Sequence, residues 1–192
     1  MSSRILLTYD LLVLACTAGF AAYDLHTRRV SDRALLHFCP IALMAPFLHA
    51  LAACMPADAS ARWNGQPALY MTPAAAQTET CLPGLLAALP PAILSSLAGA
   101  ATGFLILLAA ALISKNGAGI GGGDIKLAAV MGFAYGPYRM AAILLTASGL
   151  TAIVSIAIKL RRKGKAGSEV LSLPFVPFLA IGSLAATIAT AL

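Results

Sequence analysis

The sequence predicts an all-α, polytopic membrane protein with about six transmembrane helices in a single domain, residues 1–192. The chain is 60% hydrophobic and only 10% charged, whereas soluble domains carry about 25% charged residues. Its mean hydropathy is +0.87. Most of the apolar residues fall in runs close to the 20 or so residues that a helix needs to cross a bilayer. A charge deficit spread along the whole chain indicates that lipid is the solvent.

Six apolar segments are predicted to span the membrane. The first carries a single acid, Asp10, within its length. Prolines in residues 81–91 predict a break in the helix before the third span. Residues 81–91 are expected to form either an interfacial or a re-entrant segment. The polar, proline-containing residues 56–80 are expected to form an aqueous loop. The predicted spans are 5–22, 34–54, 92–113, 122–136, 140–158 and 170–191.

The distribution of basic residues predicts the orientation. With six spans and the N-terminus outside, the inner loops hold ten of the 13 Lys and Arg residues and the outer side holds three, one of them Arg139 in an outer turn. This matches the positive-inside rule. The expected location is therefore the cell (inner) membrane, as a multi-pass protein. Asp24 ends the first span and Asp124 begins the fourth, so both are expected at the cytoplasmic boundary.

A glycine-rich stretch, residues 116–126, precedes the fourth span. It holds five glycines and one acid, Asp124, next to an uncharged segment. Glycines lack side chains, so the backbone at 121–123 could come close to an extended substrate. Lys126 could adjust the acidity of Asp124 or bind a lipid phosphate. A simpler interpretation stays open, in which Asp124 is only the N-cap of a helix.

Asp24 and Asp124 are the candidate catalytic pair. Two carboxylates close together in a low-dielectric site cannot both ionise easily, so such a pair shares a proton at neutral pH. The ionised member can take a proton from water while the protonated one polarises a peptide carbonyl. This aspartic-protease chemistry needs no cofactor and no metal. The alternative for Asp24 is a solvated acid at the end of a span, paired with Arg28.

Other kinds of site are not expected. The four cysteines form no CxxC pair, and His37 and His49 lie on an apolar segment without a nearby carboxylate, so no metal site is predicted. Gly117, Gly119 and Gly122 fit the spacing of a dinucleotide-binding loop, but no strand of normal length precedes them. The net charge of +6 lies mostly at span ends. It indicates orientation and contact with anionic lipid headgroups rather than nucleic-acid binding.

Three motifs together resemble the type IV prepilin peptidases, which are GxGD-type intramembrane aspartic proteases. The motifs occur in the family's order, and the resemblance in topology covers most of the chain. The first motif departs from the family pattern, because His26 replaces an Arg and Val-Ser-Asp at 30–32 replaces Ile-Pro-Asn. The presenilin group shares part of the pattern but has more spans. The matching segments are Asp24 with the Arg-rich residues after it, Gly121-Gly122-Gly123-Asp124-Ile125-Lys126-Leu127, and Leu173-Pro174-Phe175-Val176-Pro177-Phe178.

The resemblance implies a membrane aspartic endopeptidase that cleaves the leader of prepilin-like (Flp/Tad pilin or pseudopilin) substrates at the cytoplasmic face. The chain lacks the N-terminal domain with paired CxxC motifs of longer members, so the short form without methyltransferase activity is expected. Two alternatives stay open: a small transporter or channel subunit, for which Asp10 is the one acid deep in a span, and an inactive membrane component of pilus assembly. The implied catalytic residues are Asp24 and Asp124, and the implied substrate-binding or site-shaping residues are Gly121, Gly122, Gly123, Lys126, Arg28 and Pro174.

Overall fold

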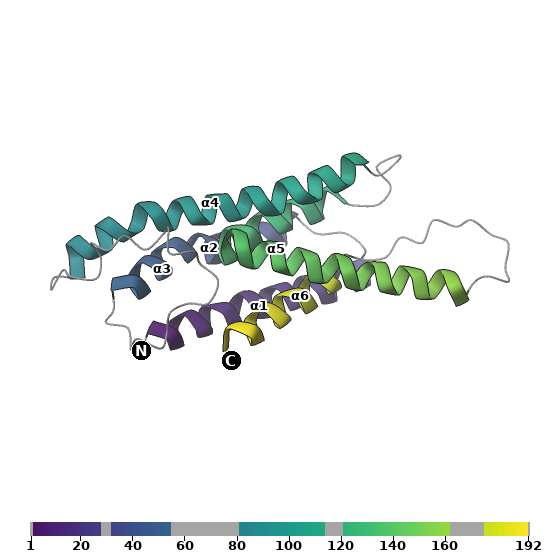
Figure 1. Cartoon of the computed structure of the whole chain (residues 1–192), viewed down its shortest axis with the longest axis horizontal. Coiled ribbons are helices and arrows are strands. Elements are labelled where there is room, and N and C mark those ends of the chain that lie inside the picture. Colours follow the sequence, from purple (N-terminus) through teal and green to yellow (C-terminus); the bar gives the residue numbers. More distant parts are fainter. Residues whose placement is uncertain (1, 28–31, 55–80, 114–120, 162–174, 192) are drawn as a thin grey trace.

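The described part of the protein is built from helices alone. A computed structural model describes residues 2–27, 32–54, 81–113, 121–161 and 175–191, and these contain no strand. Figure 1 shows the helices lying roughly along one common axis. The predicted polar loop 56–80 and the first residues of the predicted last span lie outside the described residues. The helices are α1 (Ser2–Thr27), α2 (Asp32–Leu43), α3 (Ala45–Cys54), α4 (Cys81–Ile113), α5 (Gly122–Arg161) and α6 (Val176–Ala191).

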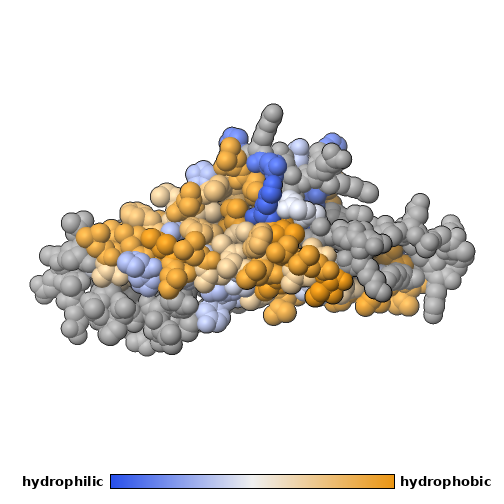
Figure 2. Space-filling model, turned by 90° about the horizontal axis from the view of Figure 1, so that it is seen from above, coloured by the Kyte–Doolittle hydropathy of each residue, from blue (hydrophilic) through white to orange (hydrophobic). Residues whose placement is uncertain are grey.

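The outer surface of the helices is suited to lipid. Large apolar side chains stand outward in most of the helices, for example Leu36, Leu112 and Leu145, which are at least 72% exposed. Figure 2 shows such side chains spread over one face of the molecule. In water this surface would be an aggregation hazard. The all-α membrane fold is confirmed, because four helical stretches are long and apolar enough to cross a membrane, with a shorter apolar helix at 176–189: Ile5–His26, Leu35–Ala53, Gly84–Ile113 and Gly122–Ile158.

Prolines act differently in two of the helical stretches. Between α2 and α3 the helix breaks at Met44, because Pro46 has no N–H to donate and restricts the residue before it. In α4, by contrast, the helix continues through Pro90 and Pro91. The break expected there is therefore wrong, and residues 81–91 are helical. The 33 residues of α4 would reach about 50 Å, which exceeds the roughly 30 Å hydrocarbon core, so α4 must tilt or project beyond it.

Gly136 divides α5 into two limbs, residues 122–135 and 137–161. Its backbone has φ 75° and ψ 172°, which is not helical and which residues with a side chain rarely adopt. Pro137 follows, and its fixed φ suits the first position of a new helix. The predicted boundary between the fourth and fifth spans falls at this point.

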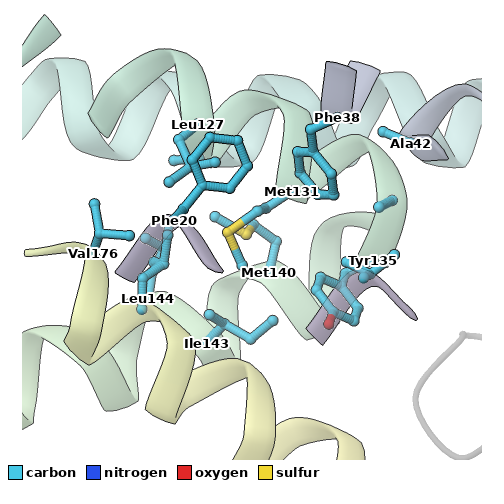
Figure 3. Close-up of a cluster of buried hydrophobic side chains, with 14 of the residues drawn as sticks. Phe20, Phe38, Ala42, Leu127, Met131, Tyr135, Met140, Ile143, Leu144 and Val176 are labelled. Atoms are coloured by element: carbon cyan, nitrogen blue, oxygen red, sulfur yellow. The ribbon is translucent and has the colours of Figure 1, made fainter. Parts of the chain in front are cut away.

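The two limbs of α5 turn back toward each other. Figure 3 shows the side chains of Met131, from the first limb, and Met140, from the second, together in the buried core. Gly103 of α4 lies beside both the backbone of Ala128 in the first limb and the terminal methyl group of Met140 in the second. A straight helix would place residues 131 and 140 about 13 Å apart. The chain therefore reverses direction at Gly136.

Close backbone contact joins α4 to the first limb of α5. A methyl group at Gly99 would clash with the carbonyl oxygen of Gly132 and with the Cα of Gly136. Gly99 and Gly103 form a GxxxG pattern on one face of α4. Lipid gives no hydrophobic force to press helices together, so small residues that permit close approach supply the packing energy. This contact fixes where the first limb of α5 lies.

The other helices complete the core around that contact. α1 packs mainly against α6 and α3, while α5 packs against α4, α6 and α2. Within the described helices, α1 and α5 share little direct backbone contact. Phe20 of α1 and Phe38 of α2 meet edge to face with ring centres 5.7 Å apart, and both belong to the buried cluster in Figure 3. α1 and α5 therefore depend on their neighbours for their relative placement.

The Gly99 contact can be tested by substitution. Gly99→Ala should lower the thermal midpoint in detergent by several degrees, because overpacking a tight contact costs about 1–3 kcal/mol. The matched control is Gly149→Ala, where a Cβ would meet nothing within 4 Å, so the midpoint should stay constant or rise. Circular dichroism melts would measure both. Equal midpoints for the two variants would contradict the close packing.

Candidate active site

Asp24 lies buried in the last turns of α1, where it faces the start of α6. Its carboxylate accepts a hydrogen bond from the backbone N–H of Val176, and Asp24 is only 6% exposed. The carbonyl of Phe175 accepts the first bonds of α6, from the N–H of Phe178 at 3.1 Å and of Leu179 at 3.2 Å. The Val176 N–H is thus one of the donors that a helix start leaves unpaired. The N-terminus of α6 supports negative charge at Asp24.

Asp124 lies at the third helical position of α5, not at the N-cap. Its backbone N–H donates to the carbonyl of Gly121 at 3.0 Å, which makes Gly121 the N-cap residue. The Asp124 carboxylate reaches back and accepts a hydrogen bond from the backbone of Gly121. This is half of a capping box, so the N-cap interpretation of Asp124 is wrong in detail. The side chain nevertheless stabilises the start of the helix while it faces Asp24.

The fold brings the two sequence-predicted acids together. Asp24 and Asp124 are one hundred positions apart in the chain, yet the Asp24 carboxylate is close enough to Asp124 for a Coulombic interaction. Close packing of α1 on α5 is not what brings them together. The start of α6 holds Asp24 through Val176, and the start of α2 holds the head of α5 through an ion pair. The site therefore lies where the end of α1 meets the beginnings of α2, α5 and α6.

That ion pair joins Lys126 of α5 to Asp32 of α2. Lys126 Nζ lies 3.0 Å from Asp32 Oδ1, and the side chains are 58% and 76% exposed. Asp32 stands where the first family motif has Asn, so this chain has a carboxylate positioned to meet the Lys of the second motif. The contact links the two segments that follow the candidate acids. Lys126 contacts Asp32 here rather than Asp124.

The glycines at the head of α5 are open to the outside. Gly121 and Gly122 are exposed, and a Cβ added at Gly122 would meet no atom within 4 Å. Gly136 is the one glycine with positive φ among the described residues. Neither packing nor backbone conformation within the described structure therefore requires glycine at position 122. Gly123 is partly exposed and continues the same segment.

An apolar groove lies between α1 and α2. It has a volume of about 450 Å³ and is open along one side. Tyr23, which lines it, directly precedes Asp24 in the sequence. The lining residues are Cys16, Gly19, Phe20, Tyr23, His37, Phe38 and Ile41.

Two of the predicted site residues, Arg28 and Pro174, lie outside the described residues. Sequence reasoning named Pro174 but missed Val176, whose backbone N–H contacts Asp24. The signal was present in the Leu-Pro-Phe-Val-Pro-Phe motif, because a proline-flanked helix start carries unpaired N–H groups. No group of three or more His, Cys, Asp or Glu side chains able to hold a metal was found in the described part of the chain.

Comparison with known proteins supports the same family. Residues 68–156 match the type IV leader peptidase family. The matched segment contains the glycines and Asp124 but does not reach Asp24. This match agrees with the family that the sequence motifs resemble.

A curated relative and the solved structures complete the comparison. The "Prepilin leader peptidase/N-methyltransferase" of Bacillus subtilis (strain 168) is 40% identical over 92 residues. That match covers 48% of this chain and 35% of the relative, so the chain aligns with about a third of the relative's length. No solved structure matched significantly.

The Lys126–Asp32 pair should contribute little to stability. Exposed ion pairs are worth about 0–1 kcal/mol and weaken in salt. A double-mutant cycle with Asp32→Asn, Lys126→Gln and the double variant should give a coupling free energy of unfolding within that range at low salt. The coupling should fall further at high salt. A coupling well above 1 kcal/mol that salt does not change would mean that the pair is desolvated, in contrast to its exposure.

Proposed function

We propose that this protein is a membrane aspartic endopeptidase that cleaves the leader peptide of type IV prepilin-like proteins. The observation that carries this proposal is the approach of Asp24 and Asp124, which are distant in sequence and interact electrostatically at one end of the helices. The match to the type IV leader peptidase family and the identity to the Bacillus subtilis relative support it. Flp/Tad pilins or pseudopilins are the proposed substrate class.

The paired carboxylates provide for water-mediated peptide hydrolysis. The ionised carboxylate accepts a proton from water as the water oxygen attacks the scissile carbonyl carbon, and the protonated carboxyl donates its proton to the carbonyl oxygen. In the resulting gem-diol, the acid that accepted the proton passes it to the amide nitrogen. The C–N bond then breaks as the other carboxylate recovers a proton from a hydroxyl group of the gem-diol. Protons and electrons balance within the pair, and no cofactor takes part in these steps.

Backbone groups hold both acids in place for this chemistry. Asp24 is fixed by the N–H of Val176 and Asp124 by the backbone of Gly121. Hydrogen bonds from rigid helix starts restrict the side chains before substrate arrives, which lowers the entropic cost of reaching the reactive geometry. In this proposal Pro174 is a site-shaping residue.

The open glycines provide access for the substrate backbone. Since nothing in the described structure requires Gly122 to lack a side chain, we assign the requirement to the substrate. Gly121 and Gly123 extend the same approach. Lys126 and Arg28 complete the proposed site, the first by holding α2 against α5 and the second by binding anionic lipid headgroups near the scissile bond.

The proposed orientation places this site at the cytoplasmic face of the cell (inner) membrane, with the N-terminus outside. The basic residues support it through the positive-inside rule. The end of α1, the end of α4 and the start of α5 fall on the same side in this arrangement. Cleavage would then occur just before the substrate's apolar helix enters the bilayer.

The structure offers no support for a transporter. That alternative needs an available acid deep in a span, and Asp10 is instead paired with Arg139 at 2.9 Å. An inactive assembly component would share this fold, so only a measurement of activity distinguishes it from a peptidase. The following substitutions provide that measurement.

Asp24→Asn and Asp124→Asn should each lower cleavage of a Flp-type prepilin by about 100-fold or more, because each removes a group that accepts or donates a proton in the reaction. The control is Glu169→Gln, which also replaces an acid by its amide but should retain most of the activity, because the proposed site does not use Glu169. Leader removal would be followed by gel shift after reconstitution in lipid vesicles. Near wild-type processing by either of the first two variants would refute the paired-acid mechanism.

Gly122→Ala should preserve the fold and reduce cleavage. The added methyl group meets no atom of the described chain, so the thermal midpoint should not fall, while the group would stand in the way of an approaching peptide backbone. We expect kcat/KM to fall about tenfold or more, since small misplacements at a reacting centre are costly. Gly149→Ala, an equally open glycine further along α5, should leave kcat/KM unchanged. Equal activity of the two variants would remove the proposed role of Gly122.

A further inference from the structure

A buried ion pair joins α1 to the second limb of α5, far from the candidate acids. Arg139 Nη1 donates to Asp10 Oδ1 at 3.1 Å, and its Nη2 lies 2.9 Å from Asp10 Oδ2. The two side chains are only 7% and 5% exposed, and the guanidinium lies 4.9 Å from the centre of the Tyr135 ring. Two parallel contacts of this kind form the bidentate fork in which Arg holds a carboxylate most firmly. The sequence placed Arg139 in an outer turn; it follows the reversal at Gly136 by three residues, and its side chain is buried.

Such a pair is an expensive way to hold helices together. The cost of taking two charges out of water often equals or exceeds their attraction, and apolar residues of similar volume often give the same stability or more. Ionisable side chains inside membrane spans are rare for this reason and usually serve a function. The mechanism proposed above uses neither Asp10 nor Arg139. Stability alone is thus a weak explanation for their presence.

The pair lies on the same two helices as the candidate acids. α1 carries both Asp10 and Asp24, which are 14 residues apart and so about 21 Å apart along the helix. In α5, the first limb rises about 18 Å from Asp124 to Gly136. The chain then reverses, and Arg139 follows three residues later. The two helices therefore approach each other at two levels, at the ion pair and at the facing acids.

Direct packing between α1 and α5 contributes little to fixing their relative position. Their backbones make little direct contact, and contacts between apolar side chains are not directional. A slip of α1 by one helical turn would move Asp24 by about 5.4 Å, which is enough to separate it from Asp124. A bidentate ion pair resists both sliding and rotation, because each oxygen has its own nitrogen partner.

We propose that the Asp10–Arg139 ion pair sets the register of α1 against α5 and thereby holds Asp24 opposite Asp124. Asp10 and Arg139 are positioning residues in this account, since they act through the two acids without touching substrate. The consequence for catalysis rests on the proposed function above. The geometric claim does not, because the approach of positions 24 and 124 can be measured without any substrate.

The test replaces the ion pair with apolar residues of similar size. Asp10→Leu and Arg139→Met in one double variant removes both charges together, so no unpaired charge stays buried. The approach of the two site positions is then measured by cross-linking. For that readout the four native cysteines are replaced by Ser, and Asp24→Cys and Asp124→Cys supply the reporter thiols. Oxidation and short bifunctional thiol reagents are applied to the protein in lipid vesicles.

A register role predicts a specific combination of results. The double apolar variant should keep a thermal midpoint at or above that of the parent protein, while cross-linking between positions 24 and 124 slows about tenfold or more. In the chain that retains both acids, kcat for prepilin cleavage should fall on the order of 100-fold with little change in KM, because misplaced groups lose rate rather than binding.

A second buried polar contact provides the matched control. Thr17 Oγ1 and Ser183 Oγ lie 3.5 Å apart and join α1 to α6 instead of α5. Since α1 and α6 also pack closely, Thr17→Val with Ser183→Ala should change neither the cross-linking rate nor kcat.

Two outcomes would overturn the proposal. Unchanged cross-linking and kcat in the apolar double variant would show that packing alone sets the register. Collapse of its thermal midpoint would show that the pair serves stability rather than register. Should Asp24→Asn and Asp124→Asn prove active, the proposed function fails, and the cross-linking rate still decides the register.

Discussion

The cost of placing charge where water is scarce shapes this protein. Three acidic or basic residues in the described helices are buried, namely Asp10, Asp24 and Arg139. Each has a specific partner: Asp10 and Arg139 have each other, and Asp24 has the N–H of Val176. Each partnership crosses between helices that are distant in the sequence. Satisfying buried charge therefore also determines which helices lie together, and the candidate site is a product of that arrangement.

Glycine has three separate uses in the same structure. Gly99 and Gly132 lack side chains because the backbones of α4 and α5 touch there, and Gly136 because the chain reverses with positive φ. Gly122 has neither reason, although it belongs to the motif that carries the family resemblance. The sequence does not distinguish these uses, since all four residues are glycines within apolar surroundings. Distances to neighbouring backbone atoms separate the packing glycines from the one that we assign to substrate access.

Several features followed from the sequence because their causes are local. The GxGDxK motif indicates Asp124 as a candidate catalytic acid, and the polar cluster at the end of the first apolar run indicates Asp24. Apolar runs of membrane-spanning length predicted the helical membrane fold, since lipid requires backbone groups to bond within each helix. Other features have causes that are not local. The continuity of α4 through Pro90 and Pro91 and the burial of Arg139 depend on helices far along the chain, so neither could be predicted from neighbouring residues.

The sequence by itself determined that the chain is helical, that it is suited to lipid, and that two acids end and begin spans on one side. The tertiary structure decided that these acids meet. It did so without close packing of α1 on α5: Val176 at the start of α6 bonds Asp24, and the buried Asp10–Arg139 pair joins α1 to α5. The physical reason is that hydropathy is a property of each segment, whereas hydrogen bonds and ion pairs need two groups whose separation only the folded chain fixes.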